Sequence, residues 1–203
     1  MAEQYFTSHP STGHDEKEIT FRFQDQWLKL MTDRGVFSKN RVDYGSRVLI
    51  TEMSRQDLIE GNILDVGCGY GPLGLVAAKL WPRKKVDLTD VNERALNLAR
   101  HNAVQNKLMN VHVFQSDGYS KITQKYGLIV TNPPIRAGKE VVSRILREAK
   151  TYLNPDGMIL TVIQKKQGEP SARRLLTETF GNCTILSRDK GYYVLKSVAQ
   201  YAD

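Results

Sequence analysis

The stretch ILDVGCGYGPLG, residues 63–74, joins an apolar run to a turn with closely spaced glycines, and the predicted fold class follows from it. The apolar residues before Gly67 predict a buried strand, and the residues after the turn predict a helix. Glycine adopts positive φ angles and lets a ligand approach the backbone, so the turn is a candidate binding site. The spacing Gly69-x-Gly71-x-x-Gly74 matches dinucleotide-binding turns, although one such match is weak evidence.

Strand and helix patterns alternate from residue 62 onward. Strands are expected at 62–66, 84–89, 111–114, 126–130 and 157–163, helices at 72–80, 93–106, 139–153 and 170–180, and a closing hairpin at 183–187 and 192–197. Repeated strand–helix units favour a Rossmann-like α/β fold. We expect a mostly parallel seven-stranded sheet with helices on both faces and an antiparallel edge strand.

The first 60 residues do not show the alternation of strand and helix patterns. Residues 1–17 are polar and are expected to form a flexible tail, whereas 18–23 and 27–31 predict a small β-hairpin. A helix is expected at 43–54, with Asp43 as its cap. One domain over residues 18–203 follows, with 18–60 as an extension and 61–203 as the cofactor-binding and catalytic core.

Composition and charge limit the function classes. The 203 residues include 29 basic and 22 acidic side chains, and the net charge of +7 suggests a polyanionic partner such as nucleic acid. A surplus of solvated lysines would give the same balance. We see no transmembrane run, no signal-peptide core and no cluster of cysteines, because Cys68 and Cys183 are far apart. A cytoplasmic, disulfide-free protein without a metal or a membrane partner is expected.

Asn132-Pro133-Pro134-Ile135 lies just past the carboxyl end of a predicted strand, where open α/β sheets hold their ligands. The two prolines remove two backbone donors and fix two φ angles, which leaves carbonyls free to face a ligand. An amide oxygen beside a free carbonyl forms a pair of acceptors suited to a planar –NH₂ group. An ordinary strand-ending turn is the alternative, since Asn-Pro also ends strands.

Three aspartates follow successive predicted strands. Asp65 would repel a pyrophosphate and suits a cation, such as the ammonium of S-adenosylmethionine held directly or through a water. Asp90 stands where such sites bind ribose hydroxyls, and Asp117 could accept from the adenine amine. Each alone is equally compatible with a turn or a helix cap. Together they favour S-adenosylmethionine over NAD or ATP.

These residues resemble the class I S-adenosylmethionine-dependent methyltransferases. Residues 64–71 are similar to the first motif of that class, and Asp90 to its ribose-binding acid. Asn132-Pro133-Pro134-Ile135 resembles the [DNS]-P-P-[YFW] motif of amino-group methyltransferases. Nearly the whole chain is similar to the RsmC-like guanine-N2 methyltransferases of small-subunit ribosomal RNA, specifically to their short, single-domain bacterial members of the YbxB type. The segments GVFS (35–38), VDYGS (42–46), NPPIRAG (132–138) and QKKQG (164–168) carry this likeness.

The resemblance implies methylation of the exocyclic N2 of a guanine in 16S ribosomal RNA, with ribosomal RNA or the 30S particle as partner and no metal. The implied catalytic residues are Asn132, Pro133, Pro134 and Ile135. The implied cofactor-binding residues are Phe37, Asp65, Gly67, Cys68, Gly69, Gly71, Asp90, Val91, Asp117, Gly118 and Asn132. The candidate phosphate contacts are Arg136, Lys139, Lys165 and Lys166, for which solvated charge is the alternative. Core packing is the alternative for Phe37.

Two departures from the family pattern leave questions open. Ile135 replaces the aromatic residue of the motif, so stacking on the target base is lost at that position. Other members use an additional N-terminal half to bind RNA, and we expect this chain to lack it, because residues 1–60 are too few to replace it fully. RNA selection is therefore expected at the N-terminal hairpin, at the basic C-terminal third, or on a pre-assembled particle. The oligomeric state stays open, with a monomer preferred.

Other function classes fit parts of the pattern. A methyltransferase of a protein glutamine or of a small-molecule amine would also use an Asn-Pro-Pro motif. A catalytically silent RNA-binding module on this fold is a second alternative, because fold does not determine function.

Overall fold

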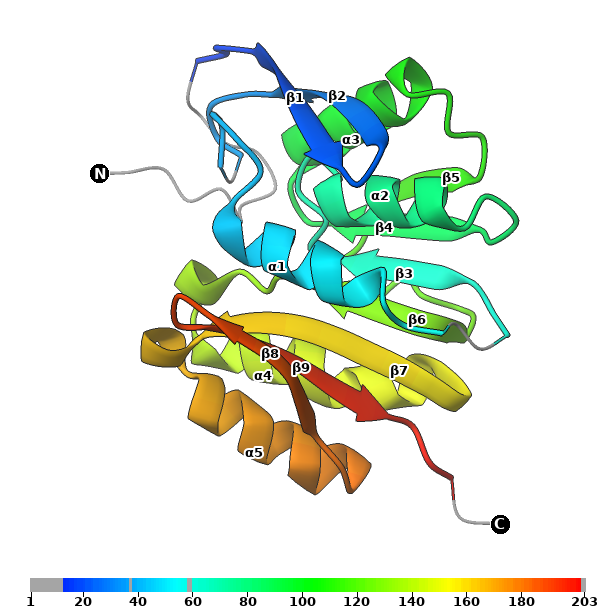
Figure 1. The fold of residues 1–203 in the computed structure, drawn as a ribbon, viewed down its shortest axis with the longest axis vertical. Helices are drawn as coiled ribbons and strands as arrows, with labels where there is room; N and C mark the ends of the chain where they lie inside the picture. Colours follow the sequence, from blue (N-terminus) through cyan, green and yellow to red (C-terminus); the bar gives the residue numbers. More distant parts are fainter. Residues whose placement is uncertain (1–12, 37, 58–59, 202–203) are drawn as a thin grey trace.

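A seven-stranded sheet forms the centre of the computed structural model, which describes residues 13–36, 38–57 and 60–201 (Figure 1). Its strands are β3 (Ile63–Val66), β4 (Val86–Asp90), β5 (Val111–Gln115), β6 (Tyr126–Thr131), β7 (Leu153–Gln164), β8 (Thr184–Asp189) and β9 (Tyr192–Val198). They lie in the order β5-β4-β3-β6-β7-β9-β8, and the first five are parallel. The expected Rossmann-like sheet is confirmed. Its antiparallel pairing lies at one edge, where β9 sits between β7 and β8.

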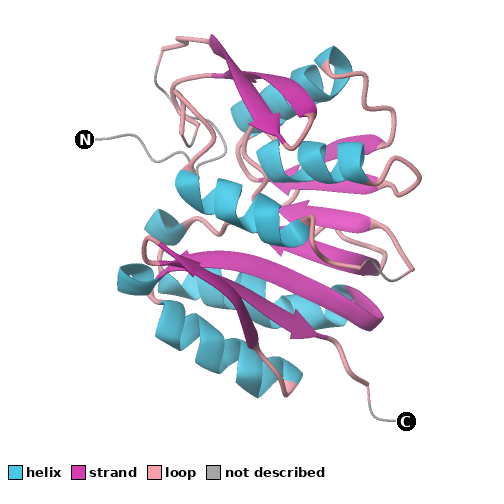
Figure 2. Ribbon diagram, viewed as in Figure 1, coloured by secondary structure: helices cyan, strands magenta, loops and turns pink. Residues whose placement is uncertain are grey.

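Helices cover both faces of this sheet (Figure 2). Helices α1 (Tyr44–Met53), α2 (Pro72–Leu80) and α3 (Glu93–Gln105) pack on one face, and α4 (Lys139–Glu148) and α5 (Glu169–Phe180) on the other. Each face has its own hydrophobic core because strand side chains alternate: Leu128 and Val130 join the first core and Ile129 the second. Every residue of β6 is buried, as expected for a central parallel strand.

The predicted N-terminal hairpin consists of β1 (Lys17–Phe23) and β2 (Gln26–Thr32). Asn102 of α3 joins the hairpin to the glycine turn. Its Oδ1 accepts from the Met31 amide at 2.6 Å, and its Nδ2 donates to the carbonyls of Met31 and Tyr70, each at 3.0 Å. Of the expected flexible tail, residues 1–12 lie outside the described residues.

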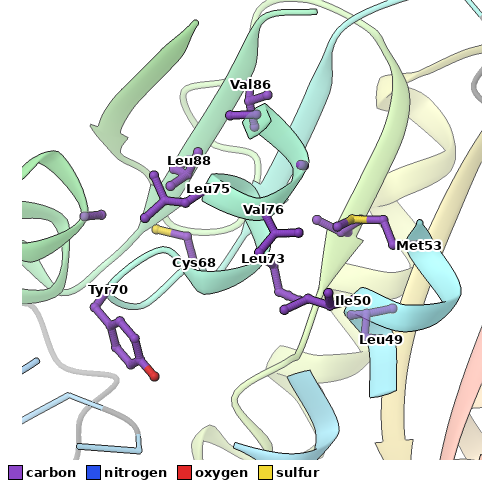
Figure 3. Close-up of a cluster of buried hydrophobic side chains, with 14 of the residues drawn as sticks. Leu49, Ile50, Met53, Cys68, Tyr70, Leu73, Leu75, Val76, Val86 and Leu88 are labelled. Carbon is purple, nitrogen blue, oxygen red and sulfur yellow. The ribbon is translucent and has the colours of Figure 1, made fainter. Parts of the chain in front are cut away.

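Helix α1 is attached to the first core by one apolar side. Its residues Leu49, Ile50 and Met53 are fully buried and lie beside Leu73 and Val76 of α2 (Figure 3). The expected cap is confirmed, because the side chain of Asp43 accepts a hydrogen bond from the Ser46 amide at 3.0 Å. Packing and capping together determine where the first turn of α1 lies.

One element ends earlier than expected. The helix expected at 139–153 ends at Glu148 and is followed by a 3₁₀ turn, η2 (Ala149–Tyr152). Leu153 already belongs to β7, where it is buried and pairs with Tyr126. Among the described helices, none is long and apolar enough to cross a membrane.

The attachment of α1 can be tested by Leu49→Ala. The substitution leaves a cavity between α1 and α2, so we expect the free energy of unfolding to fall by about 2–5 kcal/mol. Arg47→Ala, on the exposed side of the same helix, should change it by no more than about 0.5 kcal/mol. Chemical denaturation measures both, and equal effects would show that α1 does not depend on this core.

Candidate active site

A cavity of about 490 Å³ lies at the carboxyl ends of β3, β4, β5 and β6. This is the edge at which open α/β sheets bind ligands, and the volume suits a ligand of nucleoside size. Its described lining includes three groups of residues: the turn after β3 (66–70), the segments after β4 and β5 (90–92 and 116–118), and the segment after β6 (132–137).

Most of the expected site residues meet in this cavity. The lining contains Gly67, Cys68, Gly69, Asp90, Val91, Asp117, Gly118, Asn132, Pro133, Pro134, Ile135 and Arg136. Asp65, Gly71, Lys139, Lys165 and Lys166 do not line it, and Phe37 lies outside the described residues. Burial raises the pKa of the Cys68 thiol well above its ordinary value, so this side chain is a neutral part of the lining.

The glycine turn leaves open space for a ligand. Gly67 and Gly69 have positive φ angles of 72° and 57°. A Cβ added at Gly69 would meet nothing within 4 Å, and one added at Gly67 would meet only Pro134 Cδ, at 3.9 Å. The turn therefore fits close approach of S-adenosylmethionine to its backbone. Gly71 serves packing instead, because a Cβ there would lie 3.0 Å from Leu75 Cδ1.

Asp90 faces the cavity from the end of β4. Its Oδ2 accepts from the Gly69 amide at 2.8 Å and its Oδ1 from the Asn92 amide at 2.9 Å. Burial raises the pKa of this carboxyl, and the backbone donors oppose that shift. A carboxylate has about four lone-pair sites, so acceptor capacity remains for ribose hydroxyls. The residue fits its expected role, which stays a prediction.

Asp65 lies behind the cavity lining and is fully buried. Its Oδ2 accepts from the Gly74 amide at 2.8 Å, while its Oδ1 has no hydrogen-bond partner among the described residues. Burial, opposed by the bond from Gly74 and reinforced by Asp90, raises the pKa of Asp65 to about 7. The contact shown is thus to the start of α2, and the expected role toward the ammonium of the cofactor stays a prediction.

Asp117 is paired with a residue that sequence reasoning missed. Arg144 of α4 donates from Nη1 to Asp117 Oδ2 at 3.1 Å, and its Nη2 contacts Oδ1. Both side chains line the cavity. The Asp117 carboxylate therefore pairs with Arg144 and keeps lone pairs for a further donor, so its expected role toward the adenine amine stays a prediction. Helical spacing could have indicated that Arg144 belongs to the site. It lies three residues after Val141, on the same face of α4, and both residues line the cavity.

The amide of Asn132 is held from α1, 86 to 89 positions away in the chain. Its Nδ2 donates to Asp43 Oδ1 at 3.2 Å and to Ser46 Oγ at 3.0 Å. A carboxylate only accepts, so the –NH₂ edge of the amide must face Asp43. The opposite edge, Oδ1, accepts no hydrogen bond from any described residue. This orientation leaves Oδ1 available to a donor in the cavity.

The carbonyls of the two prolines differ in their partners. The Pro134 carbonyl accepts from the Ala137 amide at 2.8 Å as the 3₁₀ turn η1 (Ile135–Ala137) begins. No described residue donates to the Pro133 carbonyl. Asn132 Oδ1 and the Pro133 oxygen are therefore two neighbouring acceptors without protein donors. Thr131 Oγ1 donates to the Val66 carbonyl at 2.8 Å and ties this segment to the glycine turn.

Sequence reasoning also missed other lining residues. Asp43 was expected as a helix cap, and both Asp43 and Ser46 appeared in a family-like segment without a role in the site. Gln167 and Tyr192 line the same cavity from the C-terminal third of the chain. The local pattern around Tyr192, an ordinary hairpin strand, carries no signal for a site.

This fold and this cavity define a methyltransferase that uses S-adenosylmethionine. The family model described as "Methyltransferase small domain" matches residues 27–196, and the chain belongs to this family.

Relatives support the same assignment. The "Uncharacterized protein YbxB" of Bacillus subtilis is 43% identical over 199 residues, which cover 97% of this chain and 98% of that protein. "Ribosomal RNA small subunit methyltransferase C" of Vibrio cholerae is 31% identical over 182 residues, or 88% of this chain and 52% of the relative.

Among solved structures, the T. thermophilus 16S rRNA N2 G1207 methyltransferase (RsmC) in complex with AdoMet and guanosine aligns with a TM-score of 0.81. The identity is 24%, and the alignment covers 91% of this chain and 51% of that one, so the likeness concerns the fold. The chain spans about half the length of these methyltransferase C relatives.

The buried carboxyl of Asp65 predicts a pH effect on stability. Its pKa of about 7 in the folded protein exceeds the unfolded value of about 4, so the folded state binds more protons between these values and loses stability as the pH rises through them. Asp65→Asn removes this loss. Between pH 4 and 7 the free energy of unfolding of the variant, minus that of the wild type, should therefore rise by up to about 4 kcal/mol. Chemical denaturation at several pH values measures this difference. A difference that does not change with pH would contradict the prediction.

Proposed function

We propose that the protein transfers a methyl group from S-adenosylmethionine to the exocyclic N2 of a guanine in small-subunit ribosomal RNA. The names of the methyltransferase C relatives support this substrate. The arrangement around Asn132 supports the chemistry, and it is the observation on which the proposal depends.

Guanine N2 is a weak nucleophile because its lone pair is delocalised into the ring. Asn132 Oδ1 and the Pro133 carbonyl each accept one N–H of this amine, which turns the lone pair out of the ring plane. These acceptors also stabilise the positive charge that develops on the nitrogen. When bound, S-adenosylmethionine supplies the methyl group on a positively charged sulfur. The surplus proton leaves to solvent after the transfer.

The amide needs a fixed orientation for this role. If it were turned over, its –NH₂ group would face the amine and repel it. Asp43 Oδ1 and Ser46 Oγ prevent this by accepting from Asn132 Nδ2. The two residues are positioning residues that act through Asn132.

Basic side chains near the cavity suit an RNA backbone. Arg136 lines the cavity, Lys139 begins α4, and Lys165 and Lys166 form η3 (Lys165–Gln167) beside the lining residue Gln167. All four are exposed, and within the described ranges none forms an ion pair. They are therefore available to phosphates, whose contacts position the RNA and do not read its sequence.

The proposed substrate can be tested by methyl transfer from labelled S-adenosylmethionine to naked 16S RNA, 30S particles and total protein. We expect label in RNA, as N2-methylguanine after digestion and mass analysis, and its loss from ribosomal RNA in cells that lack the protein. Label in protein alone would favour an amine or glutamine acceptor. Binding of the cofactor without any transfer would favour the silent RNA-binding module.

The two-acceptor arrangement predicts the effect of Asn132→Ala. Loss of Oδ1 should lower kcat by about 10²–10³-fold and leave cofactor affinity, measured by calorimetry, close to the wild-type value. Ser46→Ala removes one of the two bonds that orient the amide but keeps the acceptor, so kcat should fall by about 2- to 10-fold. Near wild-type turnover of Asn132→Ala would show the mechanism to be wrong.

A further inference from the structure

The motif of this chain has Ile135 where a stacking aromatic residue would stand, so another residue must supply any aromatic contact to the base. Among the described residues, the aromatic side chains that line the cavity are those of Tyr70 and Tyr192. Tyr70 belongs to the glycine turn, is 3% exposed, and its hydroxyl points to the Ser38 carbonyl at 3.5 Å. Tyr192 is only half-buried and comes from a different part of the sheet.

The hairpin turn between β8 and β9 places Tyr192 at the cavity. Lys190 and Gly191 form this turn with positive φ angles of 46° and 80°. The Lys165 amide donates to the Gly191 carbonyl at 2.8 Å, and Tyr192 pairs with Gln164 of β7. The turn is therefore tied to the segment that carries Lys165 and Lys166.

The first turn of α1 holds the Tyr192 ring at the Asn132 end of the cavity. Gly45 lies between Asp43 and Ser46, and a Cβ there would come within 3.0 Å of Tyr192 Cε1. The rings of Tyr44 and Tyr192 lie 5.7 Å apart with an angle of 49°. The Tyr44 hydroxyl donates to Asp189 Oδ2 at 2.5 Å, which joins α1 to the hairpin. The turn that orients the Asn132 amide thus also positions this aromatic ring.

We propose that Tyr192 forms the aromatic side of the acceptor-base pocket and takes over the stacking contact that Ile135 cannot provide. The inference rests on the proposed function in that it assumes a purine base beside Asn132. Stacking on an aromatic ring is tolerant of sequence, and its loss weakens binding markedly. Tyr192 and Ile135 both line the cavity, so the base has an aromatic and an aliphatic contact within one pocket.

The test uses 2-aminopurine riboside, whose fluorescence is quenched on stacking and which carries the same exocyclic 2-amine as guanosine. In the presence of saturating S-adenosylhomocysteine, the wild type and Tyr192→Phe should quench it with similar affinity. Tyr192→Leu should bind it about tenfold or more weakly. The double variant Tyr192→Leu/Ile135→Phe should recover part of the affinity, because it restores an aromatic ring to the pocket.

Tyr193→Leu is the matched control, since Tyr193 is on the same strand and packs against the other core. The Tyr193→Leu variant should quench the fluorescence of 2-aminopurine riboside as the wild type does, and thermal unfolding shows whether each variant is folded.

In RNA methylation, Tyr192→Leu should raise KM more than it lowers kcat. Unchanged quenching by folded Tyr192→Leu, or no quenching by the wild type, would overturn the inference. Failure of the proposed function is distinct: the wild type would quench the nucleoside but transfer no label to ribosomal RNA.

Discussion

One carboxylate oxygen, Asp43 Oδ1, joins the N-terminal extension to the Asn132-Pro133-Pro134-Ile135 motif. It accepts from the Ser46 amide at 3.0 Å, which caps α1, and from Asn132 Nδ2 at 3.2 Å. The position of Asp43 depends in turn on α1, whose apolar side is buried against α2. The orientation of the Asn132 amide thus depends on hydrophobic packing of a helix, and precise sites require such support. An extension that could look dispensable is part of the site.

Two aspartates near the glycine turn, the buried Asp65 and the half-buried Asp90, show how surroundings assign different roles to one residue type. Asp90 borders the cavity and accepts hydrogen bonds from two backbone amides. These bonds stabilise its ionised form, and the carboxylate can still accept from a ligand. Asp65 has one such bond, and its other oxygen is buried and has no hydrogen-bond partner among the described residues. An unpaired buried charge is costly, and protonation near neutral pH relieves that cost. Asp65 therefore supports the start of α2, while Asp90 faces the cavity.

Much of the fold could be predicted because its signals are local. Apolar runs, glycine turns and helical periodicity each extend over a few residues, and they located the strands, the helices and the cap at Asp43. The prediction was wrong at 149–153, where periodicity continued past the real end of α4. Leu153 left the helix because it pairs with Tyr126 in the sheet, a contact between distant segments. Local propensity gives way to such tertiary contacts.

The sequence by itself determined the class of chemistry, because the glycine turn, the strand-end aspartates and Asn132-Pro133-Pro134-Ile135 are short motifs with local geometry. Only the tertiary structure decided how these residues are used. A hydrogen bond to Asp43 orients the Asn132 amide, and Arg144 pairs with Asp117. The position of β9 between β7 and β8 brings Tyr192 to the cavity. The physical reason is that such contacts depend on strand order and helix packing, which join residues far apart in the chain and leave no periodic trace in it.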